Sequence, residues 1–287
     1  MEFLLDPFLN NAFMTRALLA GVLVSIACAV VGTFVVLRGL AFIGDALAHG
    51  VLPGIAGAIL LGLPGMLGAA VGAVVMIGGV SLVTRRSRLS SDTAIGLLFV
   101  AMLALGVVMI SASDAFGGDL IAILFGQILG TSREQLAVMA AATALVIIAS
   151  VFAARPFLLL SFDPEQADVA GFSSQRYHVL MLLLVALTVV VAFQTVGTLL
   201  VFGMLLAPAA AGALLAHRTA SMMVIAAVIG SVSTYLGLLI SYWFDFAAGA
   251  TIVLVAVSVF FIVFAVTNVR DASRHVSTTD PSGETLS

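Results

Sequence analysis

The sequence predicts an all-α, polytopic membrane protein with eight or nine transmembrane helices and one short helix on the cytoplasmic side. The composition is the first reason: 62% of the 287 residues are apolar and only 9% are charged, and the mean hydropathy is +1.27. Soluble domains carry about 25% charged residues. The second reason is the succession of uncharged apolar runs, many of which reach the roughly 20 residues that cross the hydrocarbon core.

The apolar runs divide the chain into three segments: an N-terminal segment 1–16, a membrane domain 17–268 and a disordered cytoplasmic tail 269–287. No basic region precedes the first run, so a cleaved secretory signal is not expected. Residues 17–62 form either two complete spans or one span and a broken helix, which decides the side of the N-terminus. The candidate spans are 17–37, 41–62, 66–84, 93–112, 135–154, 178–196, 198–216, 220–243 and 248–267.

The positions of the arginines predict the orientation of these spans, and the absence of lysine excludes ATP hydrolysis by a Walker-type site in this chain. All 11 basic residues other than histidine are arginines, and the absence of lysine excludes a Walker-type phosphate loop, so any ATP that drives this protein is hydrolysed by another subunit. No basic stripe with interleaved aromatics suggests a nucleic-acid partner. Loops rich in arginine are expected in the cytoplasm of a multi-pass protein of the cell membrane. They contain Arg85, Arg86, Arg88, Arg155, Arg176, Arg218, Arg270 and Arg274.

The opposite loops carry three aspartates, Asp114, Asp119 and Asp245. These residues predict a mildly acidic outer rim, which either concentrates cations or consists of ordinary solvated loops.

Two polar residues inside the second apolar run carry the chemistry. Asp45 and His49 are four residues apart, so on a helix their side chains share one face. Ionisable residues within a membrane span are costly and mark functional pathways. A carboxylate oxygen and an imidazole nitrogen suit Zn²⁺, Mn²⁺ or Fe²⁺ better than Ca²⁺, which prefers oxygen ligands alone. The alternative is a structural role, either an Asp45–His49 hydrogen bond or an ion pair between Asp45 and Arg38.

Pro53 adds a backbone break to the same turn. It has no N–H to donate to the carbonyl of His49, four residues earlier, so we expect a kink and a free acceptor there. One Asp and one His leave the coordination of such a metal incomplete, because at least four donors are needed. A second copy of the chain across the pathway would supply the missing ligands, so we expect a homodimer.

The segment 161–172 contains the start and stop signals of a short helix. Asp163 suits the N-cap, Pro164 the first helical position, Glu165 the positive helix end, and Gly171 a left-handed C-terminus. This helix is either a capped surface linker or a docking helix for an energising partner. Further along, Pro208 interrupts the hydrogen-bond ladder of another span at the carbonyl of Met204, and we expect a second break in the pathway there.

Four motifs together resemble one protein family, the zinc/manganese/iron ABC permeases. They are GDALAHGVLPG at 44–54, RLSSDTAIGLLF at 88–99, SFDPEQADVAG at 161–171 and VGTLLVFGMLLAPAA at 196–210, and the resemblance covers residues 15–268. It implies a homodimeric permease that docks a separate ABC ATPase in the cytoplasm and receives a metal ion from an extracytoplasmic solute-binding protein. It also implies that Asp45 and His49 line the metal pathway, and that 161–171, Ala167 included, couples to the ATPase.

Three other functions were compared with this one. A permease for iron–siderophore or cobalamin complexes shares this architecture but generally has a longer chain and more spans, and the Asp–His pair argues against a bulky chelate. An ion-coupled secondary carrier would use Asp45 as its titrating group and need no ATPase. An intramembrane metalloenzyme would need a fuller ligand set such as H-E-x-x-H, which is absent. We therefore expect no enzymatic activity and no permanently bound cofactor, only a transported ion.

Overall fold

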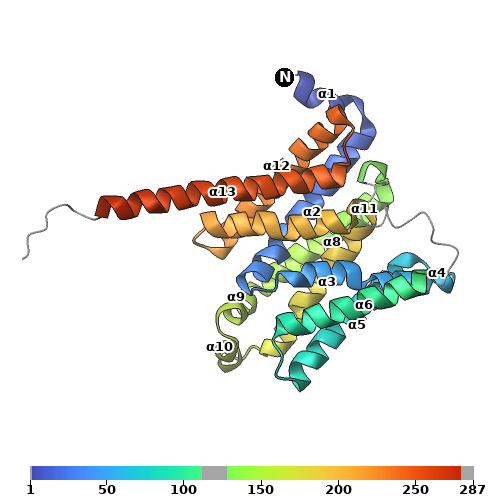
Figure 1. Cartoon of the computed structure of the whole chain (residues 1–287), viewed down its shortest axis with the longest axis vertical. Coiled ribbons are helices and arrows are strands. Elements are labelled where there is room, and N and C mark those ends of the chain that lie inside the picture. Colours follow the sequence, from blue (N-terminus) through green and yellow to red (C-terminus); the bar gives the residue numbers. More distant parts are fainter. Residues whose placement is uncertain (1, 112–127, 279–287) are drawn as a thin grey trace, which may run out of the picture.

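The computed structural model describes residues 2–111 and 128–278, and every regular element within these ranges is a helix (Figure 1). The acidic loop residues Asp114 and Asp119 lie outside the described residues. In chain order the elements are α1 (Glu2–Asn10), α2 (Ala12–Leu37), α3 (Phe42–Gly50), α4 (Leu52–Leu60), α5 (Gly65–Arg86), α6 (Ser91–Ser111), η2 (Ile128–Gly130), α8 (Arg133–Phe152), α9 (Ala154–Phe162), α10 (Pro164–Val169), α11 (Ser174–Leu215), α12 (Thr219–Phe244) and α13 (Ala248–Thr278).

Within the described ranges, eight stretches of helix are long and apolar enough to cross a membrane, which confirms the predicted fold class. They are Ala12–Leu37, Phe42–Leu60, Gly65–Arg86, Ser91–Ser111, Arg133–Phe152, Ser174–Phe193, Thr219–Phe244 and Ala248–Arg270. The remaining predicted span, 198–216, corresponds to a shorter apolar helix, Leu200–Leu215. The second stretch joins α3 and α4 across a one-residue interruption at Val51, so the region 17–62 contains one uninterrupted helix and one interrupted helix.

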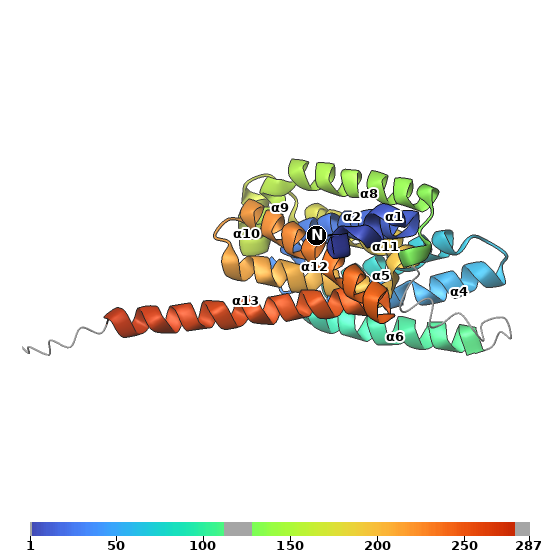
Figure 2. The same ribbon diagram turned by 90° about the horizontal axis from the view of Figure 1, so that it is seen from above.

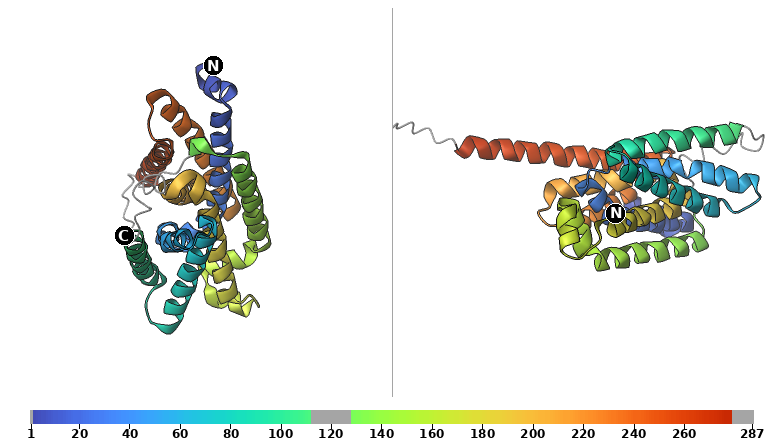
Figure 3. Two further views of the ribbon diagram at one scale, coloured as in Figure 1. Left: turned by 90° about the vertical axis from the view of Figure 1, so that its right-hand side faces the viewer. Right: turned by 90° about the horizontal axis from the view of Figure 1, so that it is seen from below.

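The helices run roughly side by side, with α9 and α10 at one end and the far ends of α4 and α6 at the other (Figures 1 and 2). Helix α2 lies at the centre of one group and contacts α8, α11 and α12, while α3, α4, α5 and α6 pack together as a second group. Helix α11 contacts both groups. Helices α6 and α8 lie on opposite flanks of the molecule (Figure 3). Together with α13 they are the most exposed spans of the described part of the chain: 17% of the most apolar stretch is buried in α6 and 22% in α8 and α13, compared with 67% in α2.

Glycine allows the helices of these groups to cross with their backbones in contact. A Cβ atom on Gly32 of α2 would clash with the carbonyl oxygen of Leu205 in α11, and a Cβ on Gly54 of α4 would clash with the carbonyl oxygen of Gly68 in α5. Close approach at small residues is the usual way in which membrane helices associate, since lipid supplies no hydrophobic drive between them. The first crossing joins α2 to α11, and the second holds α4 against α5.

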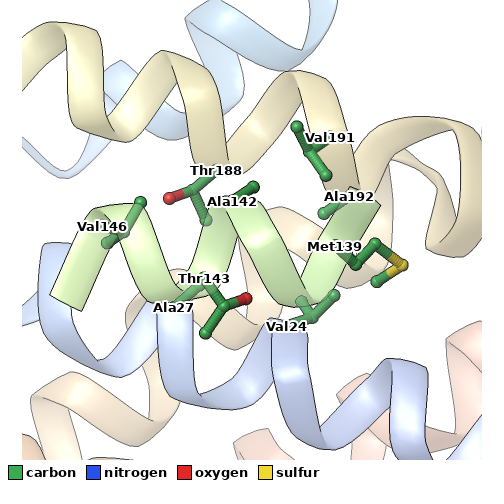
Figure 4. Close-up of a pocket in the computed structure, with 9 residues that line it drawn as sticks. All are labelled: Val24, Ala27, Met139, Ala142, Thr143, Val146, Thr188, Val191 and Ala192. Atoms are coloured by element: carbon green, nitrogen blue, oxygen red, sulfur yellow. The ribbon is translucent and has the colours of Figure 1, made fainter. Parts of the chain in front are cut away.

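The packing between α2, α8 and α11 leaves only a small apolar void (Figure 4). Its volume is about 10 Å³, close to the minimum that holds one water molecule. The Thr143 hydroxyl donates to the carbonyl of Leu23, and the Thr188 hydroxyl donates to the carbonyl of Leu184. No acidic or imidazole side chain lines this void, so it is a packing feature.

Two predicted backbone features are located differently in the structure. Helix α11 remains helical through Pro208, and its backbone departs from helical angles at Gly197 (φ 77°, ψ 165°), where glycine tolerates a positive φ without steric cost. The segment predicted as a tail from residue 269 begins inside α13, which continues to Thr278. Residues 279–287 lie outside the described part of the chain.

Candidate metal pathway and coupling helix

Asp45 and His49 lie on one face of α3, as their spacing predicts. The Nε2 atom of His49 is 3.4 Å from an Oδ atom of Asp45, and the two side chains are 21% and 32% exposed respectively. The Nδ1 atom of His49 is buried and has no hydrogen-bond partner among the described residues. The pair therefore presents a carboxylate and an imidazole that the protein leaves incompletely satisfied.

Helix α3 is packed against three neighbouring helices. Gly44 faces the side chain of Leu205 in α11, and Gly50 faces Met76 in α5 at 3.3 Å from the position of a Cβ. The ring of His49 meets the ring of Phe99 in α6 edge to face, with centroids 5.7 Å apart. Because α3 is held on these sides, the half-open face that carries Asp45 and His49 has a fixed orientation.

The turn after His49 is interrupted as the proline pattern indicates. Helix α3 ends at Gly50 and α4 begins at Leu52, with Pro53 in its first turn. Val51 keeps helical angles (φ −79°, ψ −17°), and its N–H still bonds the carbonyl of Leu47 at 3.2 Å. The interruption is therefore local, and α3 and α4 together still cross the apolar layer.

The chemistry of this pair is that of an incomplete ligand set. Among the residues that the structure describes, no group of three or more His, Cys, Asp or Glu side chains comes together. Two donors fall short of the four that a first-row transition metal ordinarily takes in proteins. The pair could hold such an ion only with ligands from water or from another chain, and incomplete coordination favours release as well as binding.

The short helix α10 forms where the punctuation predicts it. The Oδ1 atom of Asp163 accepts hydrogen bonds from the backbone N–H groups of Glu165 (2.9 Å) and Gln166 (3.1 Å). At the other end Gly171 has a φ of +85°, and the N–H of Phe172 donates to the carbonyl of Ala167, which is the usual closure of a helix by a left-handed glycine. Ala167 is buried, whereas Glu165 and its neighbours on the outer side are exposed.

Helix α10 is tied to the start of α11 by a carboxylate that the sequence did not single out. One Oδ atom of Asp168 accepts from the N–H of Ser174 at 2.8 Å, and the other accepts from the Ser174 hydroxyl at 2.9 Å. These two bonds hold the pKa of Asp168 below its ordinary value of 3.8. These bonds join α10 to the first turn of α11.

One turn further along, α11 is tied to the end of α2. An Nη atom of Arg38 lies 2.7 Å from Nδ1 of His178. A guanidinium can only donate, so His178 accepts through Nδ1 and carries its proton on Nε2. The proposed ion pair between Arg38 and Asp45 does not form. Gly39, with a φ of +64°, ends α2 directly after Arg38, and α3 begins at Phe42.

Residues 10–267 match the ABC 3 transport family. The chain belongs to this family. Within it, the manganese transport system membrane protein MntC of Halalkalibacterium halodurans is 40% identical over 264 residues, which cover 92% of this chain and 90% of the relative. A probable iron transport system membrane protein of Haemophilus influenzae is 38% identical over 269 residues, covering 94% and 98%.

A solved structure of an ABC permease shows the same fold. It is titled PsaBC from Streptococcus pneumoniae in complex with Fab, with a TM-score of 0.81, 36% identity and coverage of 92% of this chain and 94% of that chain. Together these relatives confirm that the chain is a multi-pass permease of a metal ABC importer. Such a permease subunit is not itself catalytic.

The chain also has a polar cavity of about 240 Å³ between the end of α2, α5, the start of α6, α9 and the start of α11. Two arginines, a histidine and several hydroxyl groups line it, with no acidic side chain, so it offers no ligand set for a cation. The lining residues are Arg38, Ser81, Thr84, Arg85, Ser91, Leu160, Ser174, Gln175 and His178.

Proposed function

We propose that this chain forms the membrane pathway of an ABC importer for a divalent transition-metal ion, namely manganese, zinc or ferrous iron. The observation that carries the proposal is the Asp45–His49 pair, which occupies a fixed, half-open face of a membrane helix. Relatives named for manganese and iron transport support the class of cargo. The metal is a substrate that the pair holds transiently, and no resident cofactor is needed.

A second copy of the chain would complete the coordination. Asp45 and His49 from two copies provide four donor atoms, the number that such ions ordinarily require. Both side chains are partly exposed in the single chain. Partial exposure is expected of metal ligands whose coordination is completed by a second copy of the chain. A homodimer with this face at its centre would enclose the ion between two equivalent helices. An extracytoplasmic solute-binding protein would deliver the ion to the outer mouth.

The energy would come from ATP hydrolysis on a separate subunit that binds α10. This helix is small, capped at both ends and exposed along Glu165 and Val169, so it can be moved as a unit. The hydrogen bonds of Asp168 to Ser174 and of Arg38 to His178 then connect α10 with α11 and with the end of α2, from which α3 follows. In this way movement of the ATPase would reach the helix that carries the metal ligands.

The test compares uptake of radioactive manganese by cells that express the complete transport system with wild-type or variant permease. Asp45→Ala and His49→Ala should each reduce uptake by more than tenfold, because even the loss of an outer-shell partner lowers metal affinity about 10- to 100-fold. Competition with zinc and ferrous ions in the same assay identifies the preferred ion.

Matched controls are Asp92→Ala and His217→Ala, which remove the same side chains at exposed positions. Both should leave uptake unchanged, and all four variants should insert into the membrane and retain the ATPase. Wild-type uptake in both Asp45→Ala and His49→Ala would overturn the proposal. Uptake by the purified permease alone, driven by a proton gradient in liposomes, would instead favour a secondary carrier.

A further inference from the structure

A third hollow lies apart from the Asp45–His49 pair, and neither residue lines it. This groove, with a volume of about 640 Å³, falls in the range of roughly 300–1,000 Å³ that is common for small-molecule sites. It runs between α2, α8, the first turns of α9 and the start of α12, and its lining is almost entirely apolar. We call it the lateral groove. It is lined by Val30, Phe34, Ile147, Ser150, Val151, Ala154, Arg155, Leu158, Thr219, Ala220, Met223 and Val224.

One end of the lateral groove carries positive charge. Arg155 is exposed and forms no hydrogen bond or ion pair with any described residue. Thr219 and Ala220 are the first two residues of α12, and the N-cap Arg218 provides no side-chain hydrogen bond to this helix end. The first N–H groups of a helix lack intrahelical acceptors and favour anions. An arginine and a free helix N-terminus thus border the same opening.

Deeper in the lateral groove lies a polar atom without a partner. Ser150 is 3% exposed, lines the groove, and its hydroxyl has no hydrogen-bond partner among the described residues. Serine in a membrane helix ordinarily bonds the carbonyl four residues earlier, as Ser25 does with Gly21. Ser150 lies in the last turn of α8, and Arg155 follows in the first turn of α9, after the break between the two helices at Ala153. A ligand that meets both groups therefore needs an anionic group for Arg155 and a separate hydrogen-bond acceptor for Ser150.

We infer that the lateral groove binds one anionic phospholipid of the cytoplasmic leaflet. Its phosphate lies between Arg155 and the start of α12, an ester carbonyl accepts from the Ser150 hydroxyl, and one acyl chain lies along Phe34, Ile147 and Met223. The arginine-rich loops place this end of the molecule in the cytoplasm, where anionic lipids are found. The site is independent of which ion the permease carries.

Native mass spectrometry of the full permease with its ATPase tests this inference. The complex is purified from membranes and exchanged into mixed micelles that contain equal amounts of phosphatidylglycerol and phosphatidylcholine. Wild type should retain phosphatidylglycerol preferentially, and Arg155→Gln should lower that preference about fivefold, since one arginine near the membrane surface contributes about that factor. Val224→Phe, which fills the groove but keeps the charge, should reduce retention of the lipid itself.

Arg270→Gln is the matched control, because Arg270 is an exposed arginine of α13 that does not line the groove. It should retain lipid as wild type does. Equal retention of both lipids by wild type, or equal loss of preference in Arg155→Gln and Arg270→Gln, would overturn the inference. So would a disulfide cross-link between two copies at Val151→Cys, since a second chain would then occupy the groove.

Discussion

The crossing of α4 and α5 at Gly54 and Gly68 holds α4, which directly follows the helix that carries the proposed metal ligands Asp45 and His49. A methyl group on Gly54 would clash with the carbonyl oxygen of Gly68 and would lie 2.9 Å from the backbone nitrogen of Gly72. Both are backbone atoms, so no side-chain rotation relieves the contact, and the helices must separate by about 1 Å to restore an ordinary distance. Overpacking of this kind costs about 1–3 kcal/mol.

Gly57→Ala, one turn further along α4, is the matched control for Gly54→Ala. Its methyl group would meet only the end of the flexible Met109 side chain, at 3.4 Å. Replacing a helical glycine with alanine gains up to about 1 kcal/mol from backbone entropy, and this gain applies to both variants. The difference in their stability therefore isolates the clash at the crossing.

Thermal unfolding of the purified permease measures that difference. Gly54→Ala should melt below Gly57→Ala by several degrees, at roughly 2–4 °C for each kcal/mol in domains of 150–250 residues. Metal uptake should fall in Gly54→Ala and not in Gly57→Ala, because Gly54 follows His49 by five residues. Equal melting temperatures and equal uptake in the two variants would refute the close backbone crossing.

Two further predictions concern the connection from α10 to α3. Arg38→Ala removes the 2.7 Å bond to His178 and should reduce transport while the ATPase still binds, whereas Arg88→Ala, at an exposed loop position, should have no effect on uptake. The second concerns the bonds from Asp168 to Ser174, which lower the carboxyl pKa from 3.8. Their stabilising contribution is present above that value and is lost as pH falls through the lowered pKa. Hydrogen exchange at Ser174, corrected for intrinsic rates, should show this loss below about pH 4, and Asp168→Asn should abolish the pH dependence.

Most of the fold was predictable because each membrane span is encoded by the residues of its own segment. Apolar runs set the helices, and the cap residue Asp163 and the glycine Gly171 set the short helix α10, since capping depends on residues within one turn. The Asp45–His49 face followed from a spacing of four residues. The break in α11 falls at Gly197 and not at Pro208. A positive φ takes the backbone out of the helical conformation, whereas the proline only removes one N–H donor and leaves the carbonyl of Met204 without its bond.

The connection between helices could not be predicted from local patterns. Arg38 and His178 are 140 residues apart, and nothing in either neighbourhood identifies the other as its partner. The sequence suggested Asp45 as the partner of Arg38 because it was the nearest carboxylate along the chain. Asp168 was likewise indistinguishable from other exposed acidic residues, since its role depends on where the chain places Ser174 after the left-handed turn at Gly171.

The length of α13 has a practical consequence for measuring motion. Its 31 residues extend about 46 Å at 1.5 Å per residue, whereas the hydrocarbon core is about 30 Å thick. Figure 1 shows this helix projecting beyond the rest of the molecule. A rigid rod of this kind acts as a pointer: a tilt of about 10° displaces its tip by about 8 Å. A fluorescent label near Thr278 would therefore convert small rotations of the permease into distances that energy transfer can resolve.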